Sequence, residues 1–269
     1  MDLLRVFSWR RSRCYLSIVE TLIPPPLRDP ETGFDLQQTI LEEVASGTRG
    51  PSCLIWTSPR YVAATRLETR LPGFAEAVRL SEAQGFPVLV RNSGGGAVAA
   101  NEGSLSFSLT FPVEDLRHGL YERYAEGVDL ISASLQRLGV AAEGGAVEGE
   151  FCPGDYSVRS GGEQGVKHAG LAQRVTRRAA RLEALILVNR TADLIKVLTD
   201  FHAALGLPFR PESVADLPVS VEAVVSALKA EISQRYGGVE VDPPSWIEGT
   251  NPEESNRWRA ADVDNVEQV

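Results

Sequence analysis

Three short segments carry the hydrophobic spacing of β-strands. Residues 104–111 (SLSFSLTF) alternate strictly between polar and apolar side chains, which predicts a half-buried strand that ends at Pro112. The apolar runs 53–56 and 86–90 predict two further strands. A turn at Ser58-Pro59 follows the first of them.

The second half of the chain predicts one hairpin and most of the helices. The β pattern over 151–188 indicates a strand over 166–175 that pairs with 182–188 across the turn Arg177-Arg178. A glycine-rich connector over 142–149 precedes it. Apolar residues at helical spacing predict helices over 74–83, 116–138, 192–205 and 219–235.

This mixture of elements predicts an α+β fold with mixed, mainly antiparallel sheets flanked by helices, because strands and helices do not alternate regularly. A dinucleotide-binding fold needs a helix directly after its glycine-rich turn, whereas Gly94-Gly95-Gly96 leads into another strand. We expect one domain over residues 1–240. The tail over 241–269 has seven acidic and two basic residues, and we expect it to be mostly irregular.

Composition and charge exclude several classes of protein. Hydrophobic residues make up 43% of the 269 residues and charged residues 23%, as in ordinary globular proteins. The net charge of -9 argues against nucleic acid or an anionic membrane as a partner. Charged residues interrupt residues 1–22, so no signal peptide or transmembrane segment is expected. We expect a cytoplasmic protein.

The three cysteines are too few and too scattered for a disulfide framework or a metal site. Cys14 and Cys53 have apolar neighbours, and we assign both to packing. Cys152 differs because Pro153-Gly154 forces a turn directly after it and holds the thiol on a loop. Such a thiol can act as a nucleophile beside a cation, although a lone cysteine is also commonly a small buried residue.

Lys167 and His168 are the candidate partners of this thiol, one strand away. They alternate along the strand, so at most one of them faces Cys152, and His168 can equally be a strand histidine with its ring in solvent. Of 27 basic residues only Lys167, Lys196 and Lys229 are lysines. This rarity indicates either a position where an ammonium is required or a coding bias with random exceptions.

The glycine-rich segment 91–98 (RNSGGGAV) is the second place that can carry chemistry. Three consecutive glycines let a ligand lie directly against the backbone, and Arg91 and Ser93 would supply polar contacts at the mouth. The alternative is a glycine-rich turn without a ligand.

Together these segments resemble the lipoate–biotin protein ligase and octanoyltransferase superfamily. The family pattern R-x-S-G-G-G-A-V is matched over 91–98, and its K-x-A-G-x-A-Q signature is matched at Lys167, Ala169, Gly170, Ala172 and Gln173. Residues 56–71 are similar to the segment that precedes the core of this family, so the resemblance covers residues 50–190. The cysteine in the F-C-P-G-x-Y context at Cys152 resembles the amidotransferase branch.

The resemblance implies a ligase-like catalytic domain and an acyltransferase without a cofactor. Cys152 would carry an octanoyl or lipoyl thioester, and Lys167 would bind the acyl carbonyl. The donor would be the octanoylated glycine-cleavage H protein or an acyl carrier protein, and the acceptor a lysine of the lipoyl domains of 2-oxoacid dehydrogenases. Gly94–Gly96 would line the acyl tunnel, and the full set of expected substrate-binding residues is Arg91, Ser93, Gly94, Gly95, Gly96, Ala97, Gly170 and Ala172.

Two departures from the family pattern bear on this interpretation. Ala99-Ala100 stand where ligases carry an aromatic residue and a histidine, and Ser106 replaces an asparagine. The alternatives are an ATP-dependent lipoate–protein ligase, which needs no nucleophile, and a non-catalytic protein that binds acylated carriers. For carrier docking we expect a basic patch, although a solvated turn explains the same residues: Arg174, Arg177, Arg178 and Arg181.

Overall fold

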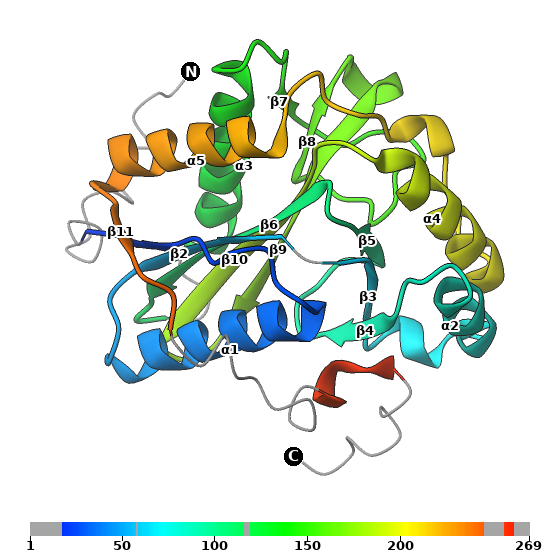
Figure 1. The fold of residues 1–269 in the computed structure, drawn as a ribbon, viewed down its shortest axis with the longest axis horizontal. Helices are drawn as coiled ribbons and strands as arrows, with labels where there is room; N and C mark the ends of the chain where they lie inside the picture. Colours follow the sequence, from blue (N-terminus) through cyan, green and yellow to red (C-terminus); the bar gives the residue numbers. More distant parts are fainter. Residues whose placement is uncertain (1–17, 58, 116–118, 245–255, 261–269) are drawn as a thin grey trace.

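Two β-sheets form the centre of the structure, a computed structural model that describes residues 18–57, 59–115, 119–244 and 256–260. An eight-stranded sheet has the order β11-β1-β2-β6-β10-β9-β8-β7, and a three-stranded sheet has the order β4-β3-β5 (Figure 1). The strands are β1 (Glu20–Leu22), β2 (Ser52–Trp56), β3 (Tyr61–Thr65), β4 (Val88–Arg91), β5 (Val98–Ala100), β6 (Ser104–Pro112), β7 (Glu143–Gly144), β8 (Ser157–Ser160), β9 (Val166–Val175), β10 (Ala179–Leu187) and β11 (Val239–Val241).

Helices cover both faces of the larger sheet. Helix α1 lies on one face, α3 and α5 lie on the other, and α2 and α4 pack together beside the smaller sheet (Figure 1). The α-helices are α1 (Pro30–Ser46), α2 (Phe74–Glu82), α3 (Leu120–Gln136), α4 (Thr191–Leu205) and α5 (Val221–Tyr236). The expected α+β class with mainly antiparallel pairing is confirmed. The parallel pairs are β1–β11, β1–β2 and β3–β4.

The predicted hairpin of β9 and β10 is confirmed, with Ala180 opposite Val175 and Ile186 opposite Ala169. Strand β10 begins at Ala179, three residues earlier than expected, because the backbone N–H of Thr176 donates to the carbonyl of Ala179 at 2.8 Å and closes the turn. This hairpin matters for function because it carries both Lys167 and the floor of the main cavity.

Strand β6 was expected to be half-buried, and this prediction was wrong. Its apolar residues Leu105, Phe107 and Leu109 pack against α3 and α5 as predicted, but its serines are buried as well. Helix α1 covers the serine face, and Ser106 exchanges a hydrogen bond of 3.1 Å with the hydroxyl of Tyr61. The polar stripe of β6 therefore faces an interior site instead of solvent.

Helix α1 has a well-defined start and end. The carboxylate of Asp29 accepts the backbone N–H of Thr32 at 2.8 Å, Pro30 occupies the first turn, and Gly47 ends the helix in the left-handed region at φ 82°. Gly33 lies directly on the indole of Trp56, since a Cβ there would come within 2.4 Å of the ring. This close approach brings α1 down onto the sheet.

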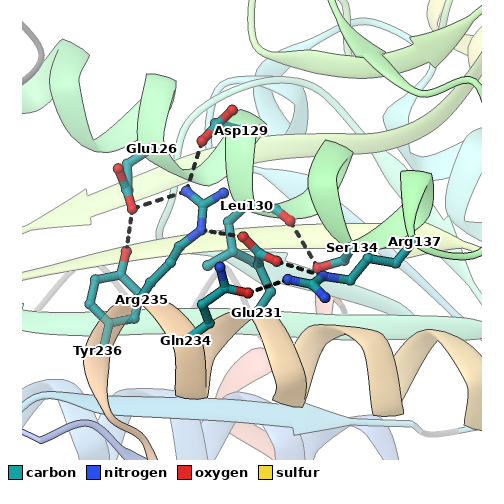
Figure 2. A network of polar contacts seen from close by, with 9 residues as sticks. All are labelled: Glu126, Asp129, Leu130, Ser134, Arg137, Glu231, Gln234, Arg235 and Tyr236. Atoms are coloured by element: carbon teal, nitrogen blue, oxygen red, sulfur yellow. Dashed lines mark hydrogen bonds and ion pairs between the residues drawn. The ribbon is translucent and has the colours of Figure 1, made fainter.

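A partly buried polar network joins α5 to α3 on the opposite face (Figure 2). The guanidinium of Arg235 contacts Glu231 at 2.7 Å, Asp129 at 2.8 Å and Glu126 at 3.2 Å. Arg137 reaches the other oxygen of Glu231 at 2.8 Å. Five charged groups, from α5, α3 and the C-cap of α3, therefore satisfy each other where α5 crosses α3, and they fix the position of α5 on the sheet.

Part of the acidic tail is packed onto the domain, which the sequence did not predict. Strand β11 adds to β1 and crosses the expected boundary at residue 240. Trp258 is buried against Phe34 with ring centroids 5.5 Å apart, and its indole N–H donates to Asp35 at 2.8 Å. Cys14, the residues 116–118 expected to start a helix, and most of the tail lie outside the described residues. Among the described helices, none has the length and apolar character needed to cross a bilayer.

Candidate active site

Cys152 lies on the loop between β7 and β8 in an unusual backbone conformation. Its φ angle of 44° is in the left-handed region, which costs a residue with a Cβ about 1–2 kcal/mol. Pro153 follows immediately, so the chain turns away and leaves the thiol half-buried at the end of a cavity. Cys53, by contrast, is fully buried in β2, where burial raises the pKa of its thiol and keeps it neutral, so its assignment to packing is confirmed.

The glycine-rich loop between β4 and β5 faces this thiol. The backbone N–H of Gly96 donates to the sulfur of Cys152 at 3.1 Å, and Nη2 of Arg91 lies 3.6 Å from the same sulfur. Gly95 has φ 100°, and a Cβ on it would come within 2.6 Å of the sulfur. The loop therefore needs glycine both for its backbone conformation and for access to the thiol.

Lys167 holds the backbone of the cysteine loop through its amino group. Its amino group donates to the carbonyl oxygens of Phe151 at 2.9 Å and Cys152 at 3.0 Å, and it pairs with Glu150 at 3.1 Å. Neither Lys167 nor Glu150 has an exposed side chain, and the ammonium also lies 4.6 Å from the centre of the Phe151 ring. Lys167 therefore holds the backbone at Cys152, while the cation nearest to the sulfur is Arg91.

A second buried carboxylate positions Arg91. Glu183 on β10 lies 3.7 Å from Arg91 and 2.9 Å from Arg181, and it accepts the hydroxyl of Ser93. Burial alone would raise the pKa of Glu183, but Arg181, Arg91 and Ser93 together hold it below its usual value. The carboxylate stays ionised, so it keeps the guanidinium of Arg91 oriented toward the loop.

An apolar cavity runs from Cys152 into the space between α1 and the two sheets. Aromatic side chains from distant parts of the chain surround it, and small residues of β9 and β10 form its floor. Its aromatic lining residues are Phe34, Trp56, Tyr61, Phe151 and Trp258, and its small or aliphatic ones include Ala63, Val98, Gly170, Leu171, Ala172, Ala184 and Leu185. The apolar part of this lining can accept a hydrocarbon chain. The cavity also has polar lining residues, which are Gln37, Arg91, Asn92, Ser106, Arg181 and Glu183.

Two polar groups inside this cavity stay neutral. Burial raises the pKa of Tyr61 to about 12, so its hydroxyl remains protonated and bonded to Ser106. Ser106 lines the cavity at the position where the family pattern has an asparagine. The hydroxyl of Ser106 on β6 therefore forms its hydrogen bond with a protein side chain, that of Tyr61.

A second, more open hollow begins where the first one ends. It shares Arg91 and Asn92 with the apolar cavity and is lined further by Ser93, Gly94 and Gly95. Its rim consists of Thr65, Arg66, Leu67 and Arg174. Cys152 thus lies between an apolar cavity and a polar hollow that meet at Arg91.

The structure brings most of the expected site residues together. Gly170 and Ala172 line the apolar cavity with Arg91, whereas Ser93, Gly94 and Gly95 line the second hollow instead of the expected tunnel. Gly96 and Ala97 line neither cavity and form the loop itself.

Two basic residues lie elsewhere than expected. Arg181 is buried and paired with Glu183, so it is not part of an exposed basic patch. His168 is buried too, and its Nε2 lies 2.8 Å from the hydroxyl of Ser160, so its ring is not in solvent.

Sequence reasoning missed the carboxylates that organise the site. Glu68 accepts the backbone N–H of Ala97 at 2.7 Å and that of Thr65 at 2.8 Å, and so fixes the glycine-rich loop to the end of β3. Glu150 and Glu183 hold Lys167 and Arg91 in the same way. Glu68 lies inside the segment 56–71 and Glu150 lies two residues before Cys152, so both carried a sequence signal, whereas Glu183 lies ten residues after Gln173 and carried none.

This arrangement can perform acyl transfer through a thioester. The sulfur has two hydrogen-bond donors that stabilise negative charge, an apolar cavity on one side for a chain, and an open approach on the other.

Comparison with known proteins finds acyltransferases among the relatives of this chain. An octanoyl-[GcvH]:protein N-octanoyltransferase of Bacillus velezensis is 28% identical over 94% of this chain and 89% of that protein. The Geobacillus kaustophilus protein of the same name is 30% identical over 70% of this chain and 63% of its own length. A lipoyl-[GcvH]:protein N-lipoyltransferase of Listeria monocytogenes is 24% identical over 67% of this chain and 64% of that protein.

Solved structures share the fold. Lipoate-protein ligase A bound with ATP superposes with a TM-score of 0.71 at 20% identity, covering 89% of this chain and 95% of that one. A bipartite lipoate protein ligase from Thermoplasma acidophilum superposes with a TM-score of 0.67 at 20% identity, covering 90% and 93%. The family described as lipoyl protein ligase A/B catalytic domain matches residues 29–242. With its cysteine loop, glycine-rich loop and fold all in place, the chain belongs to the lipoyl protein ligase A/B catalytic domain family.

Proposed function

We propose that this protein moves an octanoyl or lipoyl group from the glycine-cleavage H protein to a lysine of the lipoyl domains of 2-oxoacid dehydrogenases. The names of the relatives support the donor and the type of transfer. The observation that carries the proposal is the placement of the Cys152 sulfur at the end of an apolar cavity, 3.1 Å from the N–H of Gly96.

The reaction has two steps that share one thioester. In the first step the Cys152 sulfur attacks the carbonyl carbon of the octanoyl-lysine amide. The new C–S bond forms, the C–N bond breaks, and the proton of the thiol ends on the departing amine. In the second step the amine of the acceptor lysine attacks the thioester, the C–N bond forms, and the thiol is restored.

No ATP is needed for this exchange. The donor and the acceptor both hold the acyl group as an amide of lysine, so the overall reaction is close to thermoneutral. The less stable thioester exists only on the enzyme, where the apolar cavity shields it from water. A thiol persists in the reducing cytoplasm, and we place the reaction there.

The side chains around Cys152 support distinct roles. Arg91 and the N–H of Gly96 stabilise charge on the sulfur and on the carbonyl oxygen as the tetrahedral intermediate forms. Lys167 keeps Cys152 in its left-handed conformation through the Cys152 carbonyl and lies against Gly170, which lines the cavity. To bind the acyl carbonyl as the resemblance implies, its ammonium would exchange one of its contacts with Phe151, Cys152 or Glu150 for the acyl oxygen.

Two alternatives remain: a different acyl donor, and activation of the free acid by ATP. An octanoyl acyl carrier protein would deliver a thioester, so the first step would be thioester exchange and the second would run downhill. An ATP-dependent ligase would form an acyl-adenylate and would leave Cys152 without a function. The two donors to the sulfur favour the thioester route over the ligase.

Intact-protein mass spectrometry tests the proposal. The protein is incubated with octanoyl-H protein or octanoyl-acyl carrier protein without ATP, beside Cys152→Ala and the matched variant Cys53→Ala. We expect one octanoyl adduct that hydroxylamine removes, present in the Cys53→Ala variant and absent from the Cys152→Ala variant. Acylation of lipoyl domains only with ATP and free octanoate would instead establish a ligase and overturn the proposal.

A further inference from the structure

The second hollow gives a route to Cys152 that the apolar cavity does not provide. An acyl chain that fills the apolar cavity leaves its carbonyl at the sulfur, so the lysine that carries or receives it must arrive from another direction. Gly94 and Gly95 line the second hollow, and Gly95 lies directly against the sulfur with no side chain between them. The hollow therefore ends at Gly95, which contacts the sulfur, while Cys152 itself lines the apolar cavity.

Two exposed arginines lie at the rim of this hollow. Arg66 and Arg174 are exposed, and neither forms an ion pair with any residue that the structure describes. By contrast, Arg49, Arg137 and Arg235 each pair with carboxylates. Other arginines are exposed and unpaired among the described residues as well, namely Arg28, Arg70, Arg177 and Arg178. Arg66 and Arg174 differ from them because both line the hollow that also holds Gly94 and Gly95.

An apolar side chain completes the rim. Leu67 lies next to Arg66 and is 75% exposed, the highest value among the large exposed hydrophobic residues of the described chain. An exposed leucine flanked by arginines is typical of a protein-binding surface, where an apolar centre is surrounded by charges that orient the partner. The backbone under it is rigid because Glu68 ties this turn to the glycine-rich loop.

The two arginines come from different sheets but converge on one opening. Arg66 follows β3 of the smaller sheet, and Arg174 lies near the end of β9 in the larger sheet. Arg174 is directly opposite Arg181 in the β9–β10 pair, so both side chains project from the same face of the sheet. Arg181 reaches the apolar cavity and Arg174 reaches the second hollow.

We infer that Arg66, Leu67 and Arg174 form the docking surface for an acidic carrier domain, whose lysine arm passes over Gly94 and Gly95 to Cys152. This inference rests on the proposed function. The arginines select a partner with a negatively charged surface, since this acidic chain repels such a protein elsewhere. The same surface serves the donor and the acceptor in turn, because both must bring a lysine to the same sulfur.

Single-turnover acylation of Cys152 by octanoyl-H protein tests the inference in the full-length protein. The variants are Arg66→Glu, Arg174→Glu, the double variant and Leu67→Ala. The matched control is Lys196→Glu, an equal charge reversal at an exposed position on α4 away from both cavities. The rate of Cys152 alkylation by iodoacetamide, measured in parallel, reports whether the nucleophile and its loops are intact.

We expect the double variant to raise the half-saturating concentration of octanoyl-H protein by about tenfold or more, with the maximal acylation rate and the alkylation rate within about twofold of wild type. The dependence of acylation on salt should also flatten in the double variant, because rim charges act through long-range attraction. The Lys196→Glu control should match wild type.

The possible outcomes distinguish a failure of the docking inference from a failure of the proposed function. If wild type transfers the octanoyl group and the double variant does so at the same half-saturating concentration, the docking inference is overturned and the proposed function stands. If alkylation falls together with acylation, the arginines act on the site itself, and the docking inference is again overturned. If wild type accepts the group from no carrier protein, the proposed function fails and the docking inference fails with it.

Discussion

The backbone N–H of Gly96 lies 3.1 Å from the sulfur of Cys152, so a loop of the smaller sheet and a loop of the larger sheet meet at one hydrogen bond. Gly95, next to it, has no room for a side chain. The contact ties the reactivity of the thiol to the shape of the glycine-rich loop.

Gly95→Ala should therefore lower the rate of Cys152 acylation strongly, by about a hundredfold or more. The new methyl group would collide with the sulfur at 2.6 Å, and the φ angle of 100° is unfavourable for alanine. Gly139→Ala is the matched control, because Gly139 has φ 82° and open space around its Cβ position. The control should lose about 1 kcal/mol of stability and keep its acylation rate. Equal rates in the two variants would contradict this account.

Lys167 and Glu150 form a fully buried ion pair, and separating them should reveal what Lys167 does. Lys167→Met leaves the Glu150 carboxylate unpaired and should destabilise the protein by roughly 3–5 kcal/mol. Adding Glu150→Gln removes that charge and should restore much of the stability, measured by urea unfolding.

Acyl transfer in the double variant then separates a chemical role from a structural one. We expect transfer to remain low in Lys167→Met/Glu150→Gln, because the hydrogen bonds to the Cys152 carbonyl and the ammonium are both missing. Recovery of transfer together with stability would mean that Lys167 acts only through the fold.

Trp258 lines the apolar cavity from the C-terminal tail, and its removal should change which chains are accepted. In Trp258→Ala the ratio of kcat/KM for dodecanoyl over octanoyl donors should rise about tenfold or more, since the chains differ by four methylenes and each one accommodated in an apolar pocket is worth about 1–3 kcal/mol. The ratio is measured within one variant, so a general loss of activity does not affect it. Leu207→Ala, outside the cavity, should keep the wild-type ratio. An unchanged ratio in Trp258→Ala would exclude it as a specificity residue.

Stability should fall on acidification through His168. Burial lowers the pKa of His168 from 6.5 to about 4, so in this pH window the unfolded chain binds a proton that the folded protein does not. The free energy of unfolding should therefore be unaffected by this group above pH 6.5 and should decrease between pH 6.5 and 4, by on the order of 1–3 kcal/mol.

His168→Gln is the comparison, since it fills similar space and can still bond to Ser160. Its unfolding free energy, followed by urea denaturation at several pH values, should decline less steeply in that window. Parallel pH profiles for the variant and wild type would contradict the role of His168.

Much of the architecture could be predicted because it depends on local pattern. The hairpin of β9 and β10 follows from alternation on either side of Arg177-Arg178, and helix α4 follows from its apolar spacing. The burial of β6 on both faces could not be predicted from its own residues. Its serines look solvent-facing in the sequence, and only α1 and Tyr61 explain why they are inside.

The candidate site, like the fold, could be predicted only in part. The turn at Pro153 indicated the nucleophile, and the run of glycines indicated the loop that faces it. The alternation of side chains along the strand did not predict which groups the ammonium of Lys167 contacts. Its ammonium ends at the Cys152 carbonyl, and Arg91 from another sheet lies nearest to the sulfur. Arg181 was misassigned because the burial of its partner Glu183 depends on packing. Trp258 contacts Phe34 across more than 200 residues, a pairing that no local pattern contains.

The two sheets carry different halves of the site, so catalytic activity depends on the position of one sheet relative to the other. The larger sheet carries Cys152, Lys167 and Glu183, while the smaller one carries Arg91, Gly95 and Gly96. A slip of about one ångström between the sheets would break the contact at the sulfur, and a hydrophobic core shared by both sheets opposes such a slip. On heating, activity should thus be lost no later than the native circular dichroism, because the site depends on the contact between the two sheets.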